Sequence, residues 1–247
     1  MNFQKNNFFA LLNQIQGCDN YRHEYKYIIN PYQLEDLRLR LPTIMQSDAH
    51  TDSGGEYQIR SLYFDDYENS SFYDKENGTD SREKFRIRIY NGSADVIKLE
   101  LKKKERGKTL KKACSLTKEQ AEQIISGNGV IWDDGMPPLL KKFYVLQKTV
   151  NLQPKVIVEY DRAPFVCENG NVRVTLDLNL RTTADINRFF DKQTNCALIL
   201  PTGTNLLEVK FDEFLPDYIY QTVQLNNLQQ TSFSKFYLCR QFGGILI

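Results

Sequence analysis

Five segments of the chain alternate apolar or aromatic residues with charged ones, and this pattern constrains the fold more than any other feature of the sequence. They are RHEYK (22–26), KFRIRIY (84–90), IKLELK (97–102), VRVTLD (172–177) and LEVKFD (207–212). Successive side chains of a β-strand point to opposite faces of the sheet. Each segment therefore predicts a strand with one face that can enter a core and one face that carries charges.

Eight segments have a strand-like composition and are separated by Gly, Asn and Asp. The predicted strands cover 21–29, 56–65, 84–91, 95–104, 109–115, 155–162, 171–180 and 205–212. Asn91-Gly92 joins two of them and is typical of a two-residue hairpin turn. Short strands between turn residues predict an antiparallel sheet or barrel.

Helices are fewer, and we expect them to close or plug a barrel rather than to form a second core. Asn30 and Thr117 are suitable N-terminal caps, the first followed by Pro and the second by Gln three residues later. The predicted helices cover 31–41, 117–127, 137–150 and 216–226, with a last one that carries Lys235 and Phe236 and begins at a Ser232 cap.

The charged strand faces have two possible environments. A single strand usually turns such a face to water while its apolar face packs against helices. When most strands of one sheet share the pattern, curling the sheet brings the charged faces together inside. An unpaired buried ion costs several kcal/mol, so this interior must be hydrated and its cations balanced by carboxylates or a bound anion. Because Lys and Arg donate charge-assisted hydrogen bonds to phosphate oxygens, we expect a phosphate site.

Charge is distributed unevenly along the chain. The whole sequence is nearly neutral, with 32 Lys and Arg against 31 Asp and Glu, and so indicates no nucleic-acid partner. Residues 82–112 instead hold twelve Lys and Arg against four Asp and Glu. An anion site is expected in this region.

Four carboxylates share strand faces with the cations, namely Glu24, Glu100, Asp177 and Glu208. Hard oxygen ligands beside phosphates are the usual way of holding Mg²⁺ or Mn²⁺. Ordinary cross-strand ion pairs are the alternative explanation of the same residues. Both roles can coexist.

Several classes of protein have no support in the sequence. It contains no G-x-x-x-x-G-K-[ST] loop, no G-x-G-x-x-G after a strand and no G-x-S-x-G. The five cysteines form no C-x-x-C pair, which argues against a disulfide framework or a zinc site. His23 and His50 are predicted to lie at the surface or behind a site. No stretch of about 18 apolar residues occurs, so we expect a cytoplasmic protein without a transmembrane segment.

With these motifs in view, the chain resembles the VTC domain, the polyphosphate polymerase branch of the triphosphate tunnel metalloenzyme superfamily, which also includes the CYTH proteins. The resemblance follows the order of the family motifs from about Tyr21 to Arg240. It rests on RHEYKYII (22–29), SLYFDD (61–66), KFRIRIY (84–90), IKLELKKK (97–104), the GKTLKK run ending at Lys112, VEYDRAPF (158–165), VRVTLD (172–177), LLEVKF (206–211) and SKF (234–236).

The resemblance implies an α+β fold: a closed eight-stranded antiparallel β-barrel, the triphosphate tunnel, with helices packed outside and a C-terminal plug helix. Residues 21–247 would form this domain, and 1–20 a helical N-terminal extension. It also implies catalytic and substrate-binding cations that contact phosphates, namely Lys26, Arg86, Arg88, Lys102, Lys112, Arg162, Arg173, Lys210 and Lys235. We add Lys98 as substrate-binding because it shares a strand face with Lys102.

The resemblance also implies a set of metal ligands, and it assigns Arg162 a position that strand parity does not readily explain. Glu208 is the expected main metal ligand, with Glu24, Glu100 and Asp177 as further candidates for Mn²⁺ or Mg²⁺. Arg162 shares parity with Val158 and Tyr160, so it reaches a polar interior only through a bulge or a position past the end of its strand.

The sequence leads to a hypothesis of metal-dependent transfer of the γ-phosphoryl group of ATP onto a growing polyphosphate chain. A triphosphatase that uses water as acceptor is one alternative, and a non-catalytic module that binds polyphosphate or RNA is another. We expect ATP and polyphosphate as partners and no nucleic acid, because Phe85 and Phe211 lie on the strand faces opposite the cations.

Overall fold

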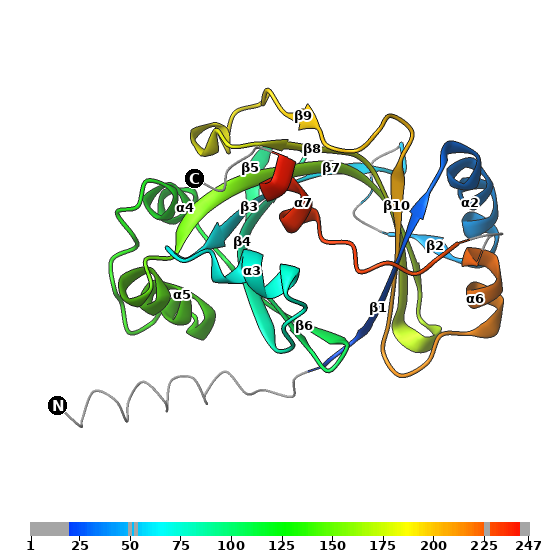
Figure 1. Cartoon of the computed structure of the whole chain (residues 1–247), viewed down its shortest axis with the longest axis horizontal. Helices are drawn as coiled ribbons and strands as arrows, with labels where there is room; N and C mark the ends of the chain where they lie inside the picture. Colours follow the sequence, from blue (N-terminus) through cyan, green and yellow to red (C-terminus); the bar gives the residue numbers. More distant parts are fainter. Residues whose placement is uncertain (1–19, 49–50, 52–53, 225–227, 243–247) are drawn as a thin grey trace.

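One antiparallel sheet dominates the computed structural model, which describes residues 20–48, 51, 54–224 and 228–242; the predicted N-terminal helix falls outside these residues. The strand order is β1-β10-β8-β7-β3-β4-β5-β6, with β2 on β7 and β9 on β8. The strands are β1 (His23–Ile29), β2 (Gln46–Ser47), β3 (Tyr57–Asp65), β4 (Arg82–Tyr90), β5 (Ser93–Glu105), β6 (Lys108–Ser115), β7 (Gln153–Cys167), β8 (Val172–Thr183), β9 (Ala197–Leu198) and β10 (Asn205–Phe211). All eight predicted strands are confirmed, and Figure 1 shows how strongly the sheet is curled.

The two edges of the sheet meet at one point. The amide N of Arg22 donates to the carbonyl O of Thr109 at 2.9 Å, and the amide N of Thr109 returns a bond to Arg22 at 2.8 Å. Between β1 and β6 this is the one bridge found in the described part of the chain. The sheet is therefore a curled, incompletely closed barrel, and the predicted full closure is not confirmed.

Two hairpin turns set the register of the basic strands. Asn91-Gly92 joins β4 to β5, as predicted, and Arg106-Gly107 joins β5 to β6. All four turn residues have positive φ, at 50° and 63° in the first turn and 49° and 76° in the second. Mirror-image turns of this kind match the twist of the flanking strands and fix which residues face each other.

A bulge in β8 changes which of its residues face the inside of the curl. The pairing with β7 shifts register between Glu159 and Asp161, and Asn179 of β8 has a φ of 51°. Asp177 lies on the inner side before the bulge, whereas Leu180 joins the inner core after it. One extra residue thus reverses the parity of the strand.

Six α-helices occur among the described residues: α2 (Pro31–Ile44), α3 (Ser70–Glu76), α4 (Lys118–Ile125), α5 (Pro138–Thr149), α6 (Asp217–Val223) and α7 (Lys235–Phe242). The capping boxes at Asn30 and Thr117 are present as predicted. The last helix begins after Ser234, whose Oγ accepts from Tyr237 N at 3.4 Å, rather than after Ser232. The sequence did not predict α3.

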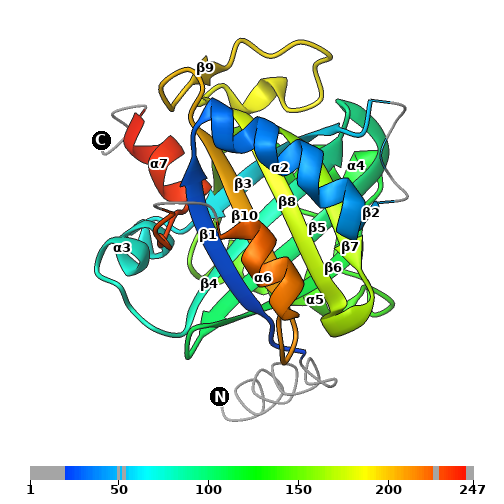
Figure 2. The same ribbon diagram turned by 90° about the vertical axis from the view of Figure 1, so that its right-hand side faces the viewer.

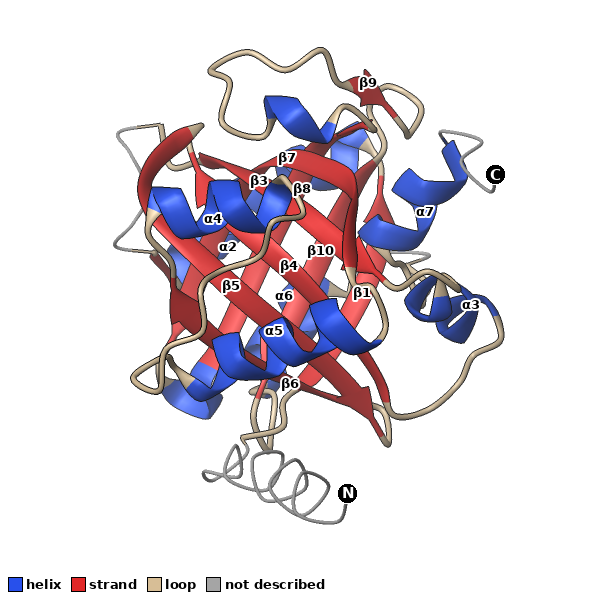
Figure 3. Ribbon diagram, turned by 90° about the vertical axis from the view of Figure 1, so that its left-hand side faces the viewer, coloured by secondary structure: helices blue, strands red, loops and turns tan. Residues whose placement is uncertain are grey.

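Two apolar layers cover the convex side of the sheet. Leu37 of α2 and Ile219 of α6 pack on β1, β8 and β10, which Figure 2 shows face on. Over the other half of the convex side, Ile124 of α4 and Phe143 of α5 pack on β4 and β5 (Figure 3). Each fully buried side chain of this size contributes about 1.5–3 kcal/mol, so these layers hold the curl against the repulsion of the charges it encloses.

A third apolar cluster lies on the concave side. Phe236 and Cys239 of α7 pack against Val156, Val158 and Tyr160 of β7, and Figure 1 shows β7 and β8 arching over this helix. The helix brings its first residue, Lys235, to the charged part of the interior. That α7 acts as a plug stays a prediction. No helix among the described residues is long and apolar enough to cross a bilayer.

Candidate functional site

The concave side of the sheet encloses a cavity of about 740 Å³, here called the central cavity. Its described lining residues include fourteen Lys and Arg. They include only two carboxylates, Glu24 and Glu208. The predicted enclosure of the charged strand faces is therefore present. Because the cations outnumber the carboxylates, the charge of the lining is complementary to that of a polyanion.

The structure brings most of the predicted site residues together at this cavity. Its lining includes Lys26, Arg86, Arg88, Lys102, Arg162, Arg173, Lys210, Lys235, Glu24 and Glu208. Glu100 and Asp177 are buried behind it and form ion pairs with lining cations. Lys98 and Lys112 are not among the lining residues.

Arg86 and Arg88 share one carboxylate partner behind the cavity wall. Arg86 Nε lies 2.7 Å from an Oε of Glu100, and Arg88 Nη1 lies 3.8 Å from the same oxygen. Lys111 Nζ lies 2.5 Å from the other oxygen. Burial favours the neutral acid, yet the two guanidinium groups and Lys111 outweigh it and hold the pKa of Glu100 well below its ordinary value. Glu100 thus orients three cations rather than facing a ligand.

Lys111 takes the place that the sequence assigned to Lys112. The Arg106-Gly107 turn pairs Lys102 with Lys111 and Leu101 with Lys112. Leu101 belongs to the outer core, so Lys112 starts from the convex face while Lys111 lines the cavity. A one-residue change of register reverses the face of every side chain, which explains the difference.

Lys98 lies on the expected strand face but beyond the lining. It faces Arg88 across the hairpin, and its Nζ donates to Ser115 Oγ at 2.8 Å. Strand parity therefore predicted the correct face of the sheet for Lys98, but the residue lies too far along β5 to line the cavity.

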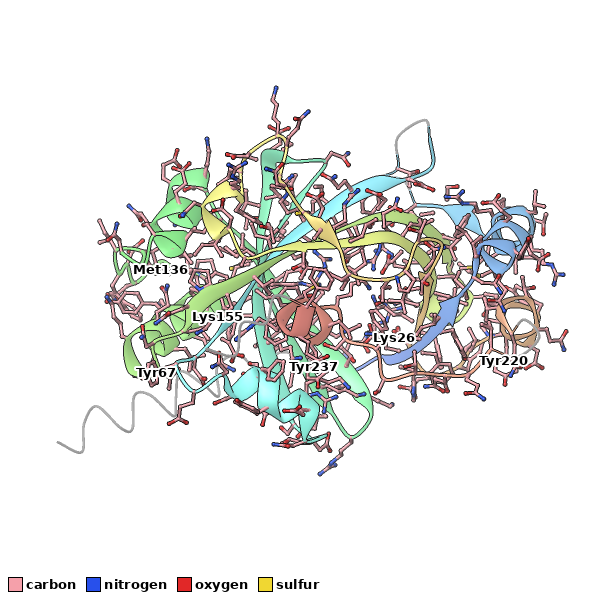
Figure 4. All side chains as sticks on the ribbon, turned by 45° about the horizontal axis from the view of Figure 1, so that its top comes forward. Lys26, Tyr67, Met136, Lys155, Tyr220 and Tyr237 are labelled. Atoms are coloured by element: carbon pink, nitrogen blue, oxygen red, sulfur yellow. The ribbon has the colours of Figure 1, made fainter. Side chains whose placement is uncertain are left out.

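Glu208 of β10 is the most heavily paired carboxylate of the cavity. Its Oε1 lies 2.8 Å from Lys235 Nζ and 3.7 Å from Lys26 Nζ, and its Oε2 lies 3.0 Å from Lys210 Nζ. Lys26 of β1 is labelled in Figure 4, where it lies between that strand and α7. Although burial alone would raise the pKa of Glu208, these ammonium groups, Lys210 foremost, hold it well below its ordinary value.

Glu24 of β1 forms the second carboxylate position. Both of its oxygens accept from Lys102 Nζ, at 2.9 and 2.7 Å, and Lys26 and Lys210 lie 3.8 and 3.7 Å away. The same two lysines approach Glu208, so Lys26 and Lys210 stand between the two carboxylates. Burial opposes ionisation of Glu24, but Lys102, Lys26 and Lys210 lower its pKa.

Arg162 and Lys235 converge on Asp177. Arg162 donates through Nε and Nη2 to the two oxygens of Asp177, at 2.6 and 2.7 Å, and Lys235 Nζ lies 2.6 Å from Oδ2. Arg162 needs no bulge of its own to reach the interior, because Tyr160 and Val158 also face inward, against α7. The parity was correct, and the assumption that apolar strand faces point outward fails for β7.

Tyrosine hydroxyls complete the cage of donors. Arg86 Nη1 lies 2.8 Å from Tyr63 Oη, Arg88 Nη2 3.3 Å from Tyr160 Oη, and Arg173 Nη2 3.0 Å from Tyr57 Oη. Burial raises the pKa of a phenol, but Arg162 and Arg88 outweigh it at Tyr160 and lower its pKa. Their partners hold these guanidinium groups in place before a ligand binds.

His23 is among the residues that line the cavity, but its ring is directed to Phe211 of the outer core. Its ring stacks on Phe211 with centroids 4.9 Å apart, so it is held by an aromatic contact. His50 lies outside the described residues.

The donor set of Glu24 and Glu208 suits a hard divalent cation. Both are carboxylates that face the cavity, and Mg²⁺ is commonly held by one or two carboxylates together with substrate phosphates and water. Within the described residues no three His, Cys, Asp or Glu side chains gather as a ready-made metal cage. The fit therefore depends on phosphate oxygens completing the coordination.

Six lining cations were not assigned from the sequence: Arg22, Lys75, Arg82, Lys84, Lys104 and Lys111. Lys84 and Lys104 continue the parity of Arg86 and Lys102, so the alternating pattern contained them. Lys75 comes from α3, an element that has no strand pattern, and its sequence gave no signal.

A comparison of the sequence with family profiles matches the VTC domain over residues 21–242. The chain therefore belongs to the VTC domain family, as its motifs predicted. No curated protein sequence matches it significantly.

Solved structures share the fold at low sequence identity. A proposed adenylyl cyclase from Hippeastrum, described as having a dominant triphosphatase activity, superposes with a TM-score of 0.52 at 13% identity, covering 90% of this chain and 96% of that one. The Mimivirus capping enzyme triphosphatase is more distant, with a TM-score of 0.41, 9% identity and coverage of 91% and 99%. The first of these supports the curled-sheet fold.

Proposed function

We propose that this protein is a metal-dependent polyphosphate polymerase that transfers the γ-phosphoryl group of ATP to a growing polyphosphate chain. The observation that carries the proposal is the enclosure of fourteen Lys and Arg with two carboxylates around one cavity of about 740 Å³. Membership of the VTC domain family and the triphosphatase activity described for the Hippeastrum neighbour support a triphosphate-handling enzyme.

The cations would hold the triphosphate in line for transfer. Phosphoryl transfer depends mainly on positioning and charge neutralisation. Arg86 and Arg88 are fixed by Glu100, Tyr63 and Tyr160, so their remaining donors cost little reorganisation when charge develops on the transferring group. Lys235 and Lys210 would approach the same phosphates from the other wall, because both meet at Glu208.

Glu208 and Glu24 would hold the divalent cation, Mn²⁺ or Mg²⁺, which would neutralise phosphate charge when bound. Each carboxylate is paired with lysines. Phosphates entering the cavity offer these lysines new anionic partners and so free carboxylate oxygens.

The acceptor needs no strong general base. A terminal phosphate of polyphosphate is already an anion at neutral pH, so its oxygen can attack without losing a proton to a side chain. His23, the one histidine at the cavity in the described chain, stacks on Phe211. The cage therefore fits phosphate as acceptor.

The test is incubation of the purified protein with ATP and Mn²⁺ or Mg²⁺, followed by separation of the products by length. We expect long polyphosphate and ADP. Glu208→Gln should abolish synthesis, whereas Lys103→Gln, which removes an outward-facing cation of β5, should not. A folded wild-type protein that makes no polyphosphate with either metal contradicts the proposal.

A triphosphatase is the second candidate, because the Hippeastrum neighbour is described as having mainly that activity. It would use the same cavity with water as acceptor. The product separates the two, since hydrolysis releases orthophosphate and leaves no chain. A non-catalytic module would instead bind polyphosphate or RNA without metal and with strong salt dependence.

A further inference from the structure

A second group of cations lines the central cavity apart from the carboxylate-paired ones. It consists of Lys75 of α3, Arg82 and Lys84 of β4 and Lys104 of β5, here called the unpaired cluster. All four side chains are partly buried. In the described chain none of them has a carboxylate oxygen within the 4.0 Å of an ion pair. Arg86, Lys102, Lys210 and Lys235 all have one.

The register of the β4–β5 hairpin places like charges opposite each other in this cluster. Arg82 faces Lys104, and Lys84 faces Lys102. Directly opposed like charges destabilise a sheet. One step further along the same face, Arg86 faces Glu100 and the charges are matched. The fold thus matches charges at one part of the hairpin and leaves two successive repulsive pairs at the next.

The contacts of the cluster are with neutral groups. Arg82 Nη1 donates to the carbonyl O of Thr79 at 2.6 Å, Lys75 Nζ to Ser232 Oγ at 3.2 Å, and Lys84 Nζ lies 4.6 Å from the centre of the Phe236 ring. Burial and the neighbouring Arg82 lower the pKa of Lys84 to about 7. Burial followed by repulsion from Arg82 also lowers the pKa of Lys75 and of Lys104. Desolvation and mutual repulsion therefore make the charged state of the cluster unfavourable, and a bound anion would stabilise it.

We propose that the unpaired cluster binds the phosphates of a polyphosphate chain that extend beyond the three held by the carboxylate-paired cations. This inference rests on the proposed function, because it adds a second subsite to the same cavity. A triphosphate would contact the carboxylate-paired cations and leave the mutual repulsion within the unpaired cluster unchanged. A longer chain would contact both groups of cations.

The chemistry of the cluster favours an inorganic phosphate chain over a nucleic acid. Single-stranded nucleic acids bind where aromatic rings offer their faces for stacking. The ring that the cluster contacts, Phe236, is buried and lies beneath the Lys84 ammonium group. A chain that presents phosphates without bases fits a cluster whose one recorded ring contact, between Lys84 and Phe236, is already covered.

The test compares affinities for tripolyphosphate and for long-chain polyphosphate by calorimetry at fixed salt and pH. The variant carries Lys75→Gln, Arg82→Gln and Lys104→Gln together. The matched control carries Lys103→Gln, Arg106→Gln and Lys108→Gln, which remove three cations of the β5–β6 hairpin that do not line the cavity. Lys84 is kept because it packs on Phe236.

We expect the variant to bind the long chain about tenfold more weakly, a change of about 1.4 kcal/mol, and tripolyphosphate within about twofold of wild type. Its melting temperature should be equal or higher, because repulsion is removed. The control should match wild type for both ligands.

Equal losses for both ligands, or no loss for the long chain, would overturn the inference. A wild-type protein that binds tripolyphosphate but binds the long chain no more tightly overturns this inference alone. A wild-type protein that binds neither ligand contradicts the proposed function as well.

Discussion

The ammonium group of Lys235 lies 2.6 Å from Oδ2 of Asp177, joining the first residue of α7 to β8. Both side chains are nearly inaccessible, at 7% and 1% exposure. Burial lowers the pKa of a lysine, but Asp177 and Glu208 outweigh it and raise the pKa of Lys235 well above its ordinary value. The pair therefore couples the position of the last helix to the charge state of the cavity.

Lys235→Met should destabilise the protein by about 3 kcal/mol, because it leaves two buried carboxylates short of a cation. Arg162 still neutralises part of Asp177, so a larger loss is not expected. Urea denaturation measures the change in the free energy of unfolding. Lys103→Met, at an outward position of β5, is the control. A loss below about 0.5 kcal/mol, the size of an ordinary surface substitution, would show that the pair does not anchor α7.

Glu100→Gln should separate stability from ligand affinity. The substitution removes the shared partner of Arg86, Arg88 and Lys111. We expect unfolding to become easier by about 3 kcal/mol and tripolyphosphate to bind severalfold more tightly, because the phosphates no longer compete with a carboxylate. Denaturation and calorimetry on the same sample measure both. Weaker binding would mean that the orientation of the three cations by Glu100 contributes more to affinity than its competition with the phosphates removes.

Lys111 and Lys112 test the register of the β5–β6 hairpin. Lys111→Met should reduce tripolyphosphate affinity about tenfold, since it removes a cation from the cavity lining. Lys112→Met should change affinity less than twofold, because Lys112 pairs with Leu101 on the outer face. Side-by-side titrations of the two variants decide the matter, and the reverse ranking would contradict the register.

The alternation of charged and apolar residues predicted most of the site. It gives the strands, their inner faces and the shared cavity, because side-chain direction in a strand follows from parity alone. The placement of Arg86, Arg88, Lys102 and Glu208 at one cavity follows from that rule.

The remainder depends on information that parity does not carry. Lys111 lines the cavity in place of Lys112 because the register of β6 depends on the Arg106-Gly107 turn, whose conformation strand parity does not specify. Lys75 joins the cavity because a helix between two strands packs beside β4, and no local pattern encodes that contact.

A charged residue in a strand does not always face the central cavity. Arg60 of β3 is 1% exposed, but it pairs with Glu159 at 2.7 Å on the opposite side of its strand from Tyr57, Ile59 and Tyr63. Its Nη1 donates to the carbonyl O of Phe189 at 3.0 Å. This buried pair fastens the segment after β8 to the sheet. The identity of a charged residue thus does not reveal which core it enters.

Lys84 should make the stability of the protein depend on pH in the alkaline range. Its pKa is about 7 in the folded chain, against 10.5 for an ordinary lysine, chiefly because burial opposes its charge. Between these two values the unfolded chain binds more protons than the folded one, so the contribution of Lys84 to stability rises with pH and is smallest below pH 7.

Replacing Lys84 with Met removes this dependence and keeps the contact with Phe236. The free energy of unfolding, measured in urea near pH 7 and near pH 9, should rise with pH by about 2 kcal/mol more in wild type than in Lys84→Met. Lys103→Met, which removes a half-buried lysine on the outer face of the neighbouring strand, should keep the wild-type slope. Equal slopes in wild type and Lys84→Met would mean that the pKa of Lys84 is not lowered by folding. The unpaired cluster would then be solvated well enough to need no anion.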